Sequence, residues 1–369
     1  MDTMVLVLFV LGLVLLIVGA EALVKGSSRL AAALGISPLV IGLTVVAYGT
    51  SSPELAVSIQ SGLAGQADLA LGNVVGSNIF SVLFILGLSA MIAPLVVSQQ
   101  LVRLDVPLMI AVSLLLLLLA LDGNLSRLDG LLFFSINIAY VVWAIRQSRK
   151  ENQQVKDEYE KEYGAAGRSS KWLVNLALIV AGLGMLVLGS HWLVEGAVAV
   201  AQALGLSELI IGLTIVAAGT SLPEVATSII ASMRGERDIA VGNVVGSNIF
   251  NILSVLGLAS LLAPNGVAVP PAALRFDIPV MIAVALACLP VFFTGFRIGR
   301  REGALFFAYY IAYTLYLILD ATGHDHLDEF SLIMFEYITP LVALTLILVA
   351  AHAWRTRRRG KPATPADEA

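Results

Sequence analysis

The sequence is poor in cysteine, histidine and charge. It has one cysteine, Cys288, and four histidines among 369 residues, and only 13% of its residues are charged. A single cysteine excludes an internal disulfide framework, and the scarcity of both residue types disfavours a zinc or copper centre built from sulfur and imidazole. About a quarter of the residues of a soluble domain are charged. The low charged fraction of this sequence therefore excludes an ordinary soluble protein.

Apolar sequence fills the chain instead. Hydrophobic residues make up 58% of it, and the mean hydropathy is +0.91. A helix that crosses a bilayer needs about 20 predominantly apolar residues. The sequence therefore predicts an all-α polytopic membrane protein, with its N-terminal segment as the first span and not a cleaved signal peptide. Eleven spans are predicted, at 3–22, 37–62, 69–93, 104–121, 127–146, 172–199, 207–232, 239–263, 274–295, 302–320 and 330–353.

Lysine and arginine set the expected orientation. Cytoplasmic loops are enriched in these residues. With the N-terminus outside and eleven spans, all but two of the 22 Lys and Arg residues fall on the cytoplasmic side, the exceptions being Arg127 and Arg275. One span more or fewer would distribute the basic residues over both sides of the membrane. The observed bias therefore supports eleven spans and a cytoplasmic C-terminus.

An internal repeat divides the chain. Residues 37–81 align with 207–251 at a constant offset of 170, with 28 of 45 positions identical, and "GNVVGSNIF" occurs unchanged at 72–80 and 242–250. Each copy belongs to a unit of five predicted spans, and an odd number of spans makes the second copy cross the membrane in the opposite direction. Inverted repeats in secondary transporters place the substrate site at the repeat interface.

The repeat predicts the domain organisation. We expect two inverted five-helix repeats, which together supply ten core helices, followed by an eleventh helix. The units are 1–146 (N-terminal repeat), 147–171 (cytoplasmic linker), 172–320 (inverted repeat), 330–353 (extra transmembrane helix) and 354–369 (basic cytoplasmic tail).

Each repeat carries a proline and a glutamate within an apolar run, in "GTSSPE" and "GTSLPE". An ionisable residue inside the membrane is costly, and its duplication at matching positions indicates function. Helical spacing places Ala47, Thr50, Ser51 and Glu54 on one face. Pro53 frees backbone carbonyls one turn earlier, and a bound cation is one partner for them. The second copy offers Ala217, Thr220, Ser221 and Glu224.

The spans that follow supply more oxygen atoms at a spacing of four residues. These are Ser77 with Ser81, and Ser247 with Asn251, while Asn73, Asn78, Asn243 and Asn248 are candidates for capping or bridging the broken helices. All of these candidate ligands are hard oxygen atoms. The two negative charges of the carboxylates balance the charge of one Ca²⁺ or of two Na⁺. Mg²⁺ fits less well because it keeps its waters and needs tighter geometry.

The duplicated motifs "GTSSPE" and "GTSLPE", each followed by "GNVVGSNIF", resemble the two alpha repeats of the cation/calcium exchanger superfamily. The sequence is similar to prokaryotic sodium/calcium exchangers over roughly residues 1–320. The resemblance implies ten core helices, of which the second, third, seventh and eighth form the ion pathway, and alternating access by two helices that slide against a fixed bundle. It also implies a multi-pass protein of the cell (inner) membrane.

The same resemblance implies roles for individual residues. Glu54 and Glu224 would bind Ca²⁺. The Na⁺ sites would use the side chains of Thr50, Ser51, Ser77, Thr220, Ser221 and Ser247 and the carbonyls of Ala47 and Ala217. Two positions depart from the pattern: Ser81 stands where several exchangers have Asn, and Asn251 where potassium-dependent relatives have Asp. The missing third carboxylate weighs against potassium dependence.

Other functions remain to be weighed. An H⁺/Ca²⁺ antiporter could use the same two glutamates as proton carriers, although the many hydroxyl groups favour Na⁺. An intramembrane hydrolase would need a base near Ser51 or Ser221. His191, within a predicted span, has no evident triad partner and no counterpart in the other half, so we expect no enzyme. A channel fits broken inverted repeats less well. We expect Ca²⁺ and Na⁺ as substrates, no cofactor and no nucleic-acid partner, and the oligomeric state stays open.

Overall fold

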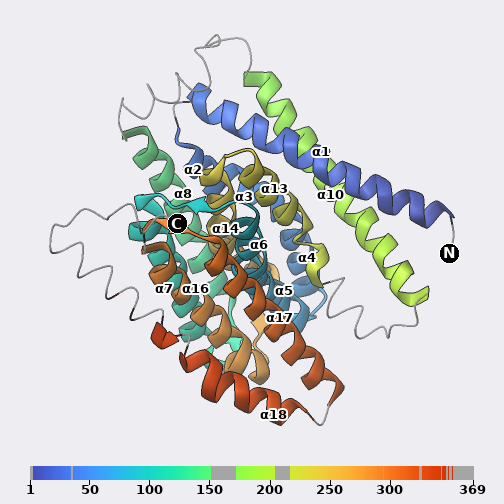
Figure 1. Ribbon diagram of the computed structural model, residues 1–369. Helices are drawn as coiled ribbons and strands as arrows, with labels where there is room; N and C mark the ends of the chain where they lie inside the picture. Colours follow the sequence, from blue (N-terminus) through green and yellow to red (C-terminus); the bar gives the residue numbers. More distant parts are fainter. Residues whose placement is uncertain are drawn as a thin grey trace.

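The computed structural model describes residues 3–34, 36–150, 172–203, 217–293, 295–323, 326–341, 343–345, 348 and 351. These residues form a bundle of helices with four very short strands (Figure 1). The described part holds eight helices long and apolar enough to cross a membrane, or nine if the bent pair Pro38–Thr50 and Ser52–Leu63 is one span. The predicted all-α polytopic membrane fold is confirmed.

The helices follow the same order in both halves, with η marking π-helical turns and the 3₁₀ turn η4. The first half contains α1 (Thr3–Leu34), α2 (Pro38–Ile41), η1 (Gly42–Val46), α3 (Ala47–Thr50), α4 (Ser52–Leu63), α5 (Ala67–Phe80), η2 (Ser81–Leu86), α6 (Gly87–Ile92), η3 (Leu101–Asp105), α7 (Val106–Leu119), η4 (Ala120–Asp122) and α8 (Arg127–Lys150). The second half contains α10 (Trp172–Ala203), α12 (Ala217–Gly219), α13 (Leu222–Met233), α14 (Arg237–Phe250), η6 (Asn251–Leu256), α15 (Gly257–Leu262), η7 (Ala273–Asp277), α16 (Ile278–Phe293), α17 (Arg300–Thr322), α18 (Leu327–Leu332) and η8 (Ile333–Ile338).

Some predicted segments lie partly or wholly outside the described residues. The first part of the predicted span 207–232 falls in residues 204–216, which are not described, and α13 is its second part. Helix α8 continues four residues past the predicted boundary at 146, and the rest of the predicted linker lies outside the described residues. Within 330–353 the chain is helical through residue 341, whereas the predicted tail 354–369 is not described.

The second predicted span is broken in the middle. Its two parts, α2–η1–α3 and α4, meet at Ser51 with a bend of 50°. Ser51 leaves helical geometry (φ −81°, ψ 14°), and Pro53 stands in the first turn of α4, where a missing backbone N–H costs nothing. Ser221 has nearly the same geometry (φ −89°, ψ 7°) before α13. Both "GTS-x-PE" motifs therefore sit at a helix break.

Helices α1 and α10 form a separate pair along one flank of the bundle (Figure 1). Helix α1 is longer than the predicted span 3–22, because the helix-forming residues of "EALVKGSSRLAAAL" continue it to Leu34. Glycines recur every seven residues on both helices. A Cβ added at Gly19 would lie 2.9 Å from the carbonyl oxygen of Gly182, and one added at Gly12 would lie 2.8 Å from that of Gly189. The absence of side chains at these positions lets the two backbones touch.

The third predicted span and its repeat partner occupy the centre of the bundle. In Arg237–Leu262 the most apolar window is 89% buried, and in Leu69–Ile92 it is 72% buried. The same measure is 6% for Arg300–Thr322, which therefore lies at the periphery. A span buried on all sides can place polar side chains in the interior, and both central spans carry the motif "GNVVGSNIF".

Two small antiparallel sheets each join one loop from each half. Strand β1 (Leu95–Val96) pairs with β4 (Arg297–Ile298), and β2 (Asn124–Leu125) pairs with β3 (Val267–Ala268). The loop carrying β1 corresponds in the repeat to the loop carrying β3, and the β2 loop corresponds to the β4 loop. The two sheets are thus the same contact with the halves exchanged, as expected for repeats of opposite orientation.

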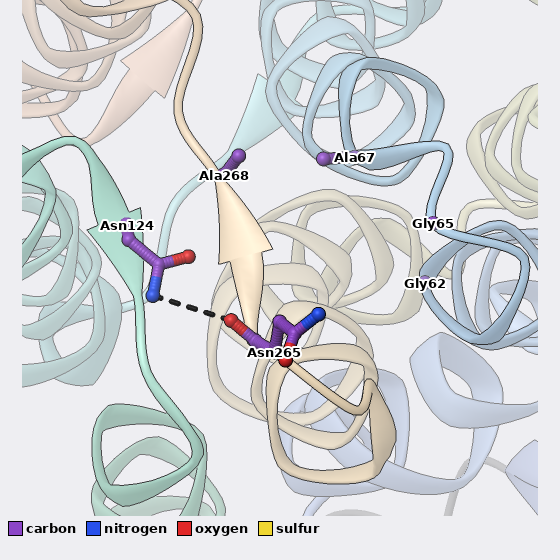
Figure 2. A pocket seen from close by; sticks show the side chains of 7 residues that line it. Gly62, Gly65, Ala67, Asn124, Asn265 and Ala268 are labelled. Atoms are coloured by element: carbon purple, nitrogen blue, oxygen red, sulfur yellow. Dashed lines mark hydrogen bonds between the residues drawn. The ribbon is translucent and has the colours of Figure 1, made fainter.

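A small pocket of about 220 Å³ lies beside β2 and β3 (Figure 2). Glycines and alanines line most of it, and Asn124 Nδ2 donates a hydrogen bond of 3.3 Å to the carbonyl oxygen of Asn265 across its mouth. Its lining has no charged side chain and none of the predicted site residues. The predicted site residues lie elsewhere, around the two helix breaks.

Candidate functional site

The two helix breaks face each other, and each glutamate is held by a serine of the other half. Ser51 Oγ donates a hydrogen bond of 2.7 Å to Glu224 Oε1, and Ser221 Oγ donates one of 2.8 Å to Glu54 Oε1. The four residues come from the two copies of one motif, and the pattern is reciprocal. Glu54 and Glu224 are 170 residues apart in the sequence, and the symmetry expected of inverted repeats accounts for their meeting at one point.

Both carboxylates are buried. Glu54 is 1% exposed and Glu224 is 2% exposed, and among the described residues neither Oε2 atom has a hydrogen-bond partner. A buried carboxylate oxygen without a donor is expensive unless a cation binds there. Each glutamate therefore presents one oxygen fixed by a serine and one oxygen available as a ligand.

The threonines of the motif make a second reciprocal set of contacts. Thr50 Oγ1 donates to Asn243 Oδ1 at 3.2 Å, and Thr220 Oγ1 donates to Asn73 Oδ1 at 3.4 Å. Thr50 also lies 3.3 Å from the carbonyl oxygen of Ala47. These contacts tie each broken helix to the central span of the opposite half, and they bring hydroxyl, amide and carbonyl oxygens to the same region.

The asparagines are held in turn by residues that the sequence did not single out. Asn73 Nδ2 donates to Ser58 Oγ at 2.9 Å and to the carbonyl oxygen of Glu54 at 3.1 Å, and Asn243 Nδ2 donates to Ser228 Oγ at 3.0 Å. Ser58 and Ser228 are repeat partners at the offset of 170, one turn beyond each glutamate. The presence of serine at this position in both copies of the repeat is the sequence feature that could have identified the two residues.

The serines of the central spans border the glutamates. Ser77 Oγ lies 3.3 Å from Ser221 Oγ, whose proton is donated to Glu54. Ser247 is fully buried, and its hydroxyl has no hydrogen-bond partner in the described part of the chain. A buried hydroxyl with free lone pairs suits a cation ligand.

Asn251 and Ser81 lie one turn further along the same helices, at the start of the π-helical turns η6 and η2. Asn251 Nδ2 donates to Asn78 Oδ1 at 3.1 Å, which leaves its own Oδ1 without a partner among the described residues. Ser81 is 1% exposed. The backbone of Ala217 begins α12, so the two alanines stand at matching points of the breaks.

The backbone carbonyl oxygens that the proline is predicted to leave without partners find some of them in local hydrogen bonds. Ser52 Oγ donates to the carbonyl oxygen of Gly49 at 2.8 Å, and the backbone N–H of Ser51 donates to that of Ala47 at 3.0 Å. A carbonyl oxygen has two lone pairs. The Ala47 oxygen accepts from Ser51 and lies 3.3 Å from the Thr50 hydroxyl, so its second lone pair is available to a cation when that hydroxyl donates to Asn243.

The donor set fits a cation that prefers oxygen. Within the described ranges there is no cluster of three or more His, Cys, Asp and Glu residues that could hold a metal ion. Two carboxylates surrounded by hydroxyl, amide and carbonyl oxygens suit Ca²⁺ or Na⁺, which accept neutral oxygen ligands in an adaptable geometry.

The surroundings of the two breaks differ. A groove of about 600 Å³ lies beside the first break, lined by Gly49 and Ser52 and by Leu183, Gly184, Val187, Leu188 and His191 of α10. Helix α13, which follows the second break, packs against α1, and Arg234 at its end forms an ion pair with Glu21 of α1. An open groove therefore lies beside the first break, and a packed helix lies beside the second.

Comparison with known proteins identifies the relatives of this chain. Residues 4–146 and 174–319 match the family model described as sodium/calcium exchanger protein. The sodium/calcium exchanger MaX1 of Methanosarcina acetivorans is 34% identical over 349 residues, which cover 86% of this chain and 99% of the relative. The inner membrane protein YrbG of Escherichia coli is 39% identical over 286 residues, which cover 76% of this chain and 86% of the relative. The solved structure of the sodium-calcium exchanger NCX_Mj matches with a TM-score of 0.73 and 32% identity over 84% of this chain and 98% of that chain.

Proposed function

Because this chain belongs to the sodium/calcium exchanger protein family, we propose that it exchanges Na⁺ for Ca²⁺ across a membrane by alternating access and without K⁺. The family consists of exchangers, so the chain is a membrane transporter and not an enzyme. Ca²⁺ and Na⁺ are its proposed substrates, and no resident cofactor is invoked.

The observation that carries the proposal is the reciprocal pair of bonds from Ser51 to Glu224 and from Ser221 to Glu54. It gives one site with two carboxylates, whose two charges match one Ca²⁺ or two Na⁺. Since Ca²⁺ and Na⁺ would bind to the same oxygen atoms, the binding of one ion excludes the other. Mutual exclusion at one site is the property that couples two opposite fluxes.

The roles of the individual residues follow from this competition. Glu54 and Glu224 would hold Ca²⁺ through their free oxygens. Na⁺ would use the neutral oxygens around them, from Thr50, Ser51, Ser77, Thr220, Ser221 and Ser247 and from the carbonyls of Ala47 and Ala217. Asn251 and Ser81 would border the site one turn away.

One feature of the site favours Na⁺ over H⁺ as the coupling ion, and a second weighs against a requirement for K⁺. The hydroxyl and carbonyl oxygens near the glutamates are ligands that Na⁺ needs and a proton does not. Asn251 is neutral and bound to Asn78, so the site keeps two formal charges and gains no third carboxylate to balance an additional K⁺.

The same proposal covers the organisation in the membrane. The two five-helix units, 1–146 and 172–320, would be the repeats, joined by the linker 147–171 and followed by the extra helix 330–353 and the tail 354–369. Lysine and arginine counts support an external N-terminus and a cytoplasmic C-terminus. The relative YrbG is an inner membrane protein, which supports placement in the cell membrane.

The test uses purified protein in liposomes loaded with Na⁺ and diluted into medium without Na⁺ or K⁺. ⁴⁵Ca²⁺ uptake should require internal Na⁺ and should be unaffected when a proton ionophore collapses any pH gradient. Uptake driven by a pH gradient in the absence of Na⁺ would overturn the proposal in favour of H⁺/Ca²⁺ exchange. Uptake that requires K⁺ with Na⁺ would overturn the K⁺-independence alone.

A further inference from the structure

A hydrogen bond outside the ion site reaches the first helix break from α8. Tyr48 lies on α3, next to Ala47 and two residues before Thr50. Its hydroxyl donates a hydrogen bond of 2.6 Å to Asn137 Oδ1. The ring of Tyr48 packs on Phe250 with 4.0 Å between ring centroids, and Phe250 directly precedes Asn251.

Asn137 is an unusual residue for its position. It lies in the middle of the apolar span Arg127–Ser148 and is 4% exposed. A buried amide in an apolar helix is costly unless its groups are bonded. Tyr48 satisfies the amide oxygen, so the presence of Asn137 is explained by the tyrosine that it holds.

The segment that carries Tyr48 is the last turn before the first helix break. Helix α3 has four residues and follows the π-helical turn η1. Its N-terminal side keeps backbone hydrogen bonds, such as the one from the Ala47 N–H to the Gly42 carbonyl oxygen, whereas the helix axis bends by 50° at Ser51. The end of a helix has fewer backbone partners than its interior. The bond from Tyr48 to Asn137 therefore adds a side-chain constraint to the turn that includes the carbonyl of Ala47 and the hydroxyl of Thr50.

We propose that Asn137 is a positioning residue of the ion site, which acts through Tyr48 to fix the Ala47 carbonyl and the Thr50 hydroxyl for Na⁺. The inference rests on the proposed function, since it assigns Na⁺ to these two oxygens. It extends the site to α8, a helix that supplies none of the ion ligands.

The second half of the chain does not carry this pair. Ala218 occupies the position of Tyr48 at the offset of 170. In the fifth span of each half, "GLLFFSINIAY" aligns with "GALFFAYYIAY", which places Tyr310 opposite Asn137. The tether is thus a property of the first half, and Tyr310 offers a matched control: a tyrosine in the corresponding helix, packed edge-on against Phe80.

The experiment is a double-mutant cycle on ⁴⁵Ca²⁺ uptake into Na⁺-loaded liposomes. The variants are Tyr48→Phe, Asn137→Leu, the double variant and Tyr310→Phe. Tyr48→Phe keeps the ring and its contact with Phe250, so it removes the hydrogen bond with little change in packing. The half-saturating internal Na⁺ concentration and the half-saturating external Ca²⁺ concentration are measured for each.

We expect Tyr48→Phe and Asn137→Leu each to raise the half-saturating Na⁺ concentration about fivefold, the size associated with one lost hydrogen bond. The double variant should resemble either single variant, because both remove the same bond. The half-saturating Ca²⁺ concentration should change less than twofold, and Tyr310→Phe should match the wild type.

Two results would overturn the positioning role. One is additive effects of the two substitutions. The other is a fall in maximal rate, or in the amount of folded protein, with both half-saturating concentrations unchanged in Tyr48→Phe. If the wild-type protein itself shows no Na⁺-driven uptake, the proposed function fails first, and the two failures are thereby distinguished.

Discussion

Ser221 binds Glu54 through a hydrogen bond of 2.8 Å across 167 residues of sequence. The matching bond joins Ser51 to Glu224 across 173 residues. Each glutamate thus bonds to a serine of the other copy of the motif. In the proposed arrangement, neither repeat holds a complete site, and two similar halves in opposite orientations build one site together.

The two glutamates should both be indispensable. Glu54→Gln or Glu224→Gln keeps the side-chain size and removes one of the two buried charges. Loss of one partner of a buried charged contact costs about 2–5 kcal/mol, so Ca²⁺ uptake should fall roughly a hundredfold or more in either variant, measured as ⁴⁵Ca²⁺ flux into Na⁺-loaded liposomes.

Glu302→Gln is the matched control for this change. Glu302 stands in the first turn of α17, away from the site, and its replacement should leave the flux at the wild-type rate. Size-exclusion chromatography establishes that each variant is folded. A wild-type rate in either Glu54→Gln or Glu224→Gln would mean that the site lies elsewhere.

The two serines should contribute equally. Ser51→Ala and Ser221→Ala each remove a hydrogen bond to a carboxylate, which contributes about 1.5–3 kcal/mol. Both should weaken Ca²⁺ binding about tenfold or more by isothermal titration calorimetry. Ser52→Ala is the control, because its hydroxyl is exposed and, among the described residues, bonds to the backbone of Tyr48 and Gly49. Unequal effects of the two site variants would argue against a reciprocal site.

The contact between α1 and α10 should not tolerate a side chain. Gly19→Leu would place Cβ 2.9 Å from the carbonyl oxygen of Gly182 and force the helices apart. We expect the melting temperature to fall by several degrees, which corresponds to about 1–3 kcal/mol of overpacking. Gly184→Ala is the control on α10, where the added Cβ meets open space. A Gly19→Leu protein as stable as the control would show that the close approach does not matter.

The ion pair between Glu21 and Arg234 should help to hold α1 against α13. Ser232, two residues before Arg234 on α13, is buried at 3% exposure, so Ser232→Cys, in a Cys288→Ala background, reports whether α13 becomes accessible. Since both charged side chains are partly exposed, the pair is worth at most about 1 kcal/mol. Arg234→Gln should therefore speed thiol labelling at residue 232 up to about fivefold.

High salt supplies the control for the ion pair, because it screens exposed charges. At about 1 M salt the difference between Arg234→Gln and Arg234 proteins should vanish. Glu21→Gln should reproduce the effect of Arg234→Gln, and the double variant should add nothing. Labelling at the same rate in both single variants and in the double variant would show that packing alone holds α1 against α13.

The repeat made much of the fold and the site predictable. Glu54 and Glu224 could be identified because membrane carboxylates are rare and these two stand at matching positions. The helix breaks at Ser51 and Ser221 followed from Pro53 and Pro223. The fold class followed from the apolar spans, since only helices or closed barrels satisfy their backbones in lipid.

Contacts between the repeats were beyond the sequence. One repeat gives Ser51 and Glu54 on one face, but the pairing of Ser51 with Glu224 depends on how the halves dock. The link from Tyr48 to Asn137 spans 89 residues and involves two different residue types that the second half lacks, so no periodic pattern marks it. The length of α1 was missed because the hydropathy falls after Ala20 while the helix-forming residues continue.

The most direct test of a single shared site is calorimetric titration of the purified protein with Ca²⁺ at several fixed Na⁺ concentrations. We predict one Ca²⁺ per chain, with an apparent affinity that falls as the square of the Na⁺ concentration or more steeply once Na⁺ saturates the site. Two independent Ca²⁺ per chain, or an affinity that Na⁺ leaves unchanged, would contradict a site in which Glu54 and Glu224 serve both ions.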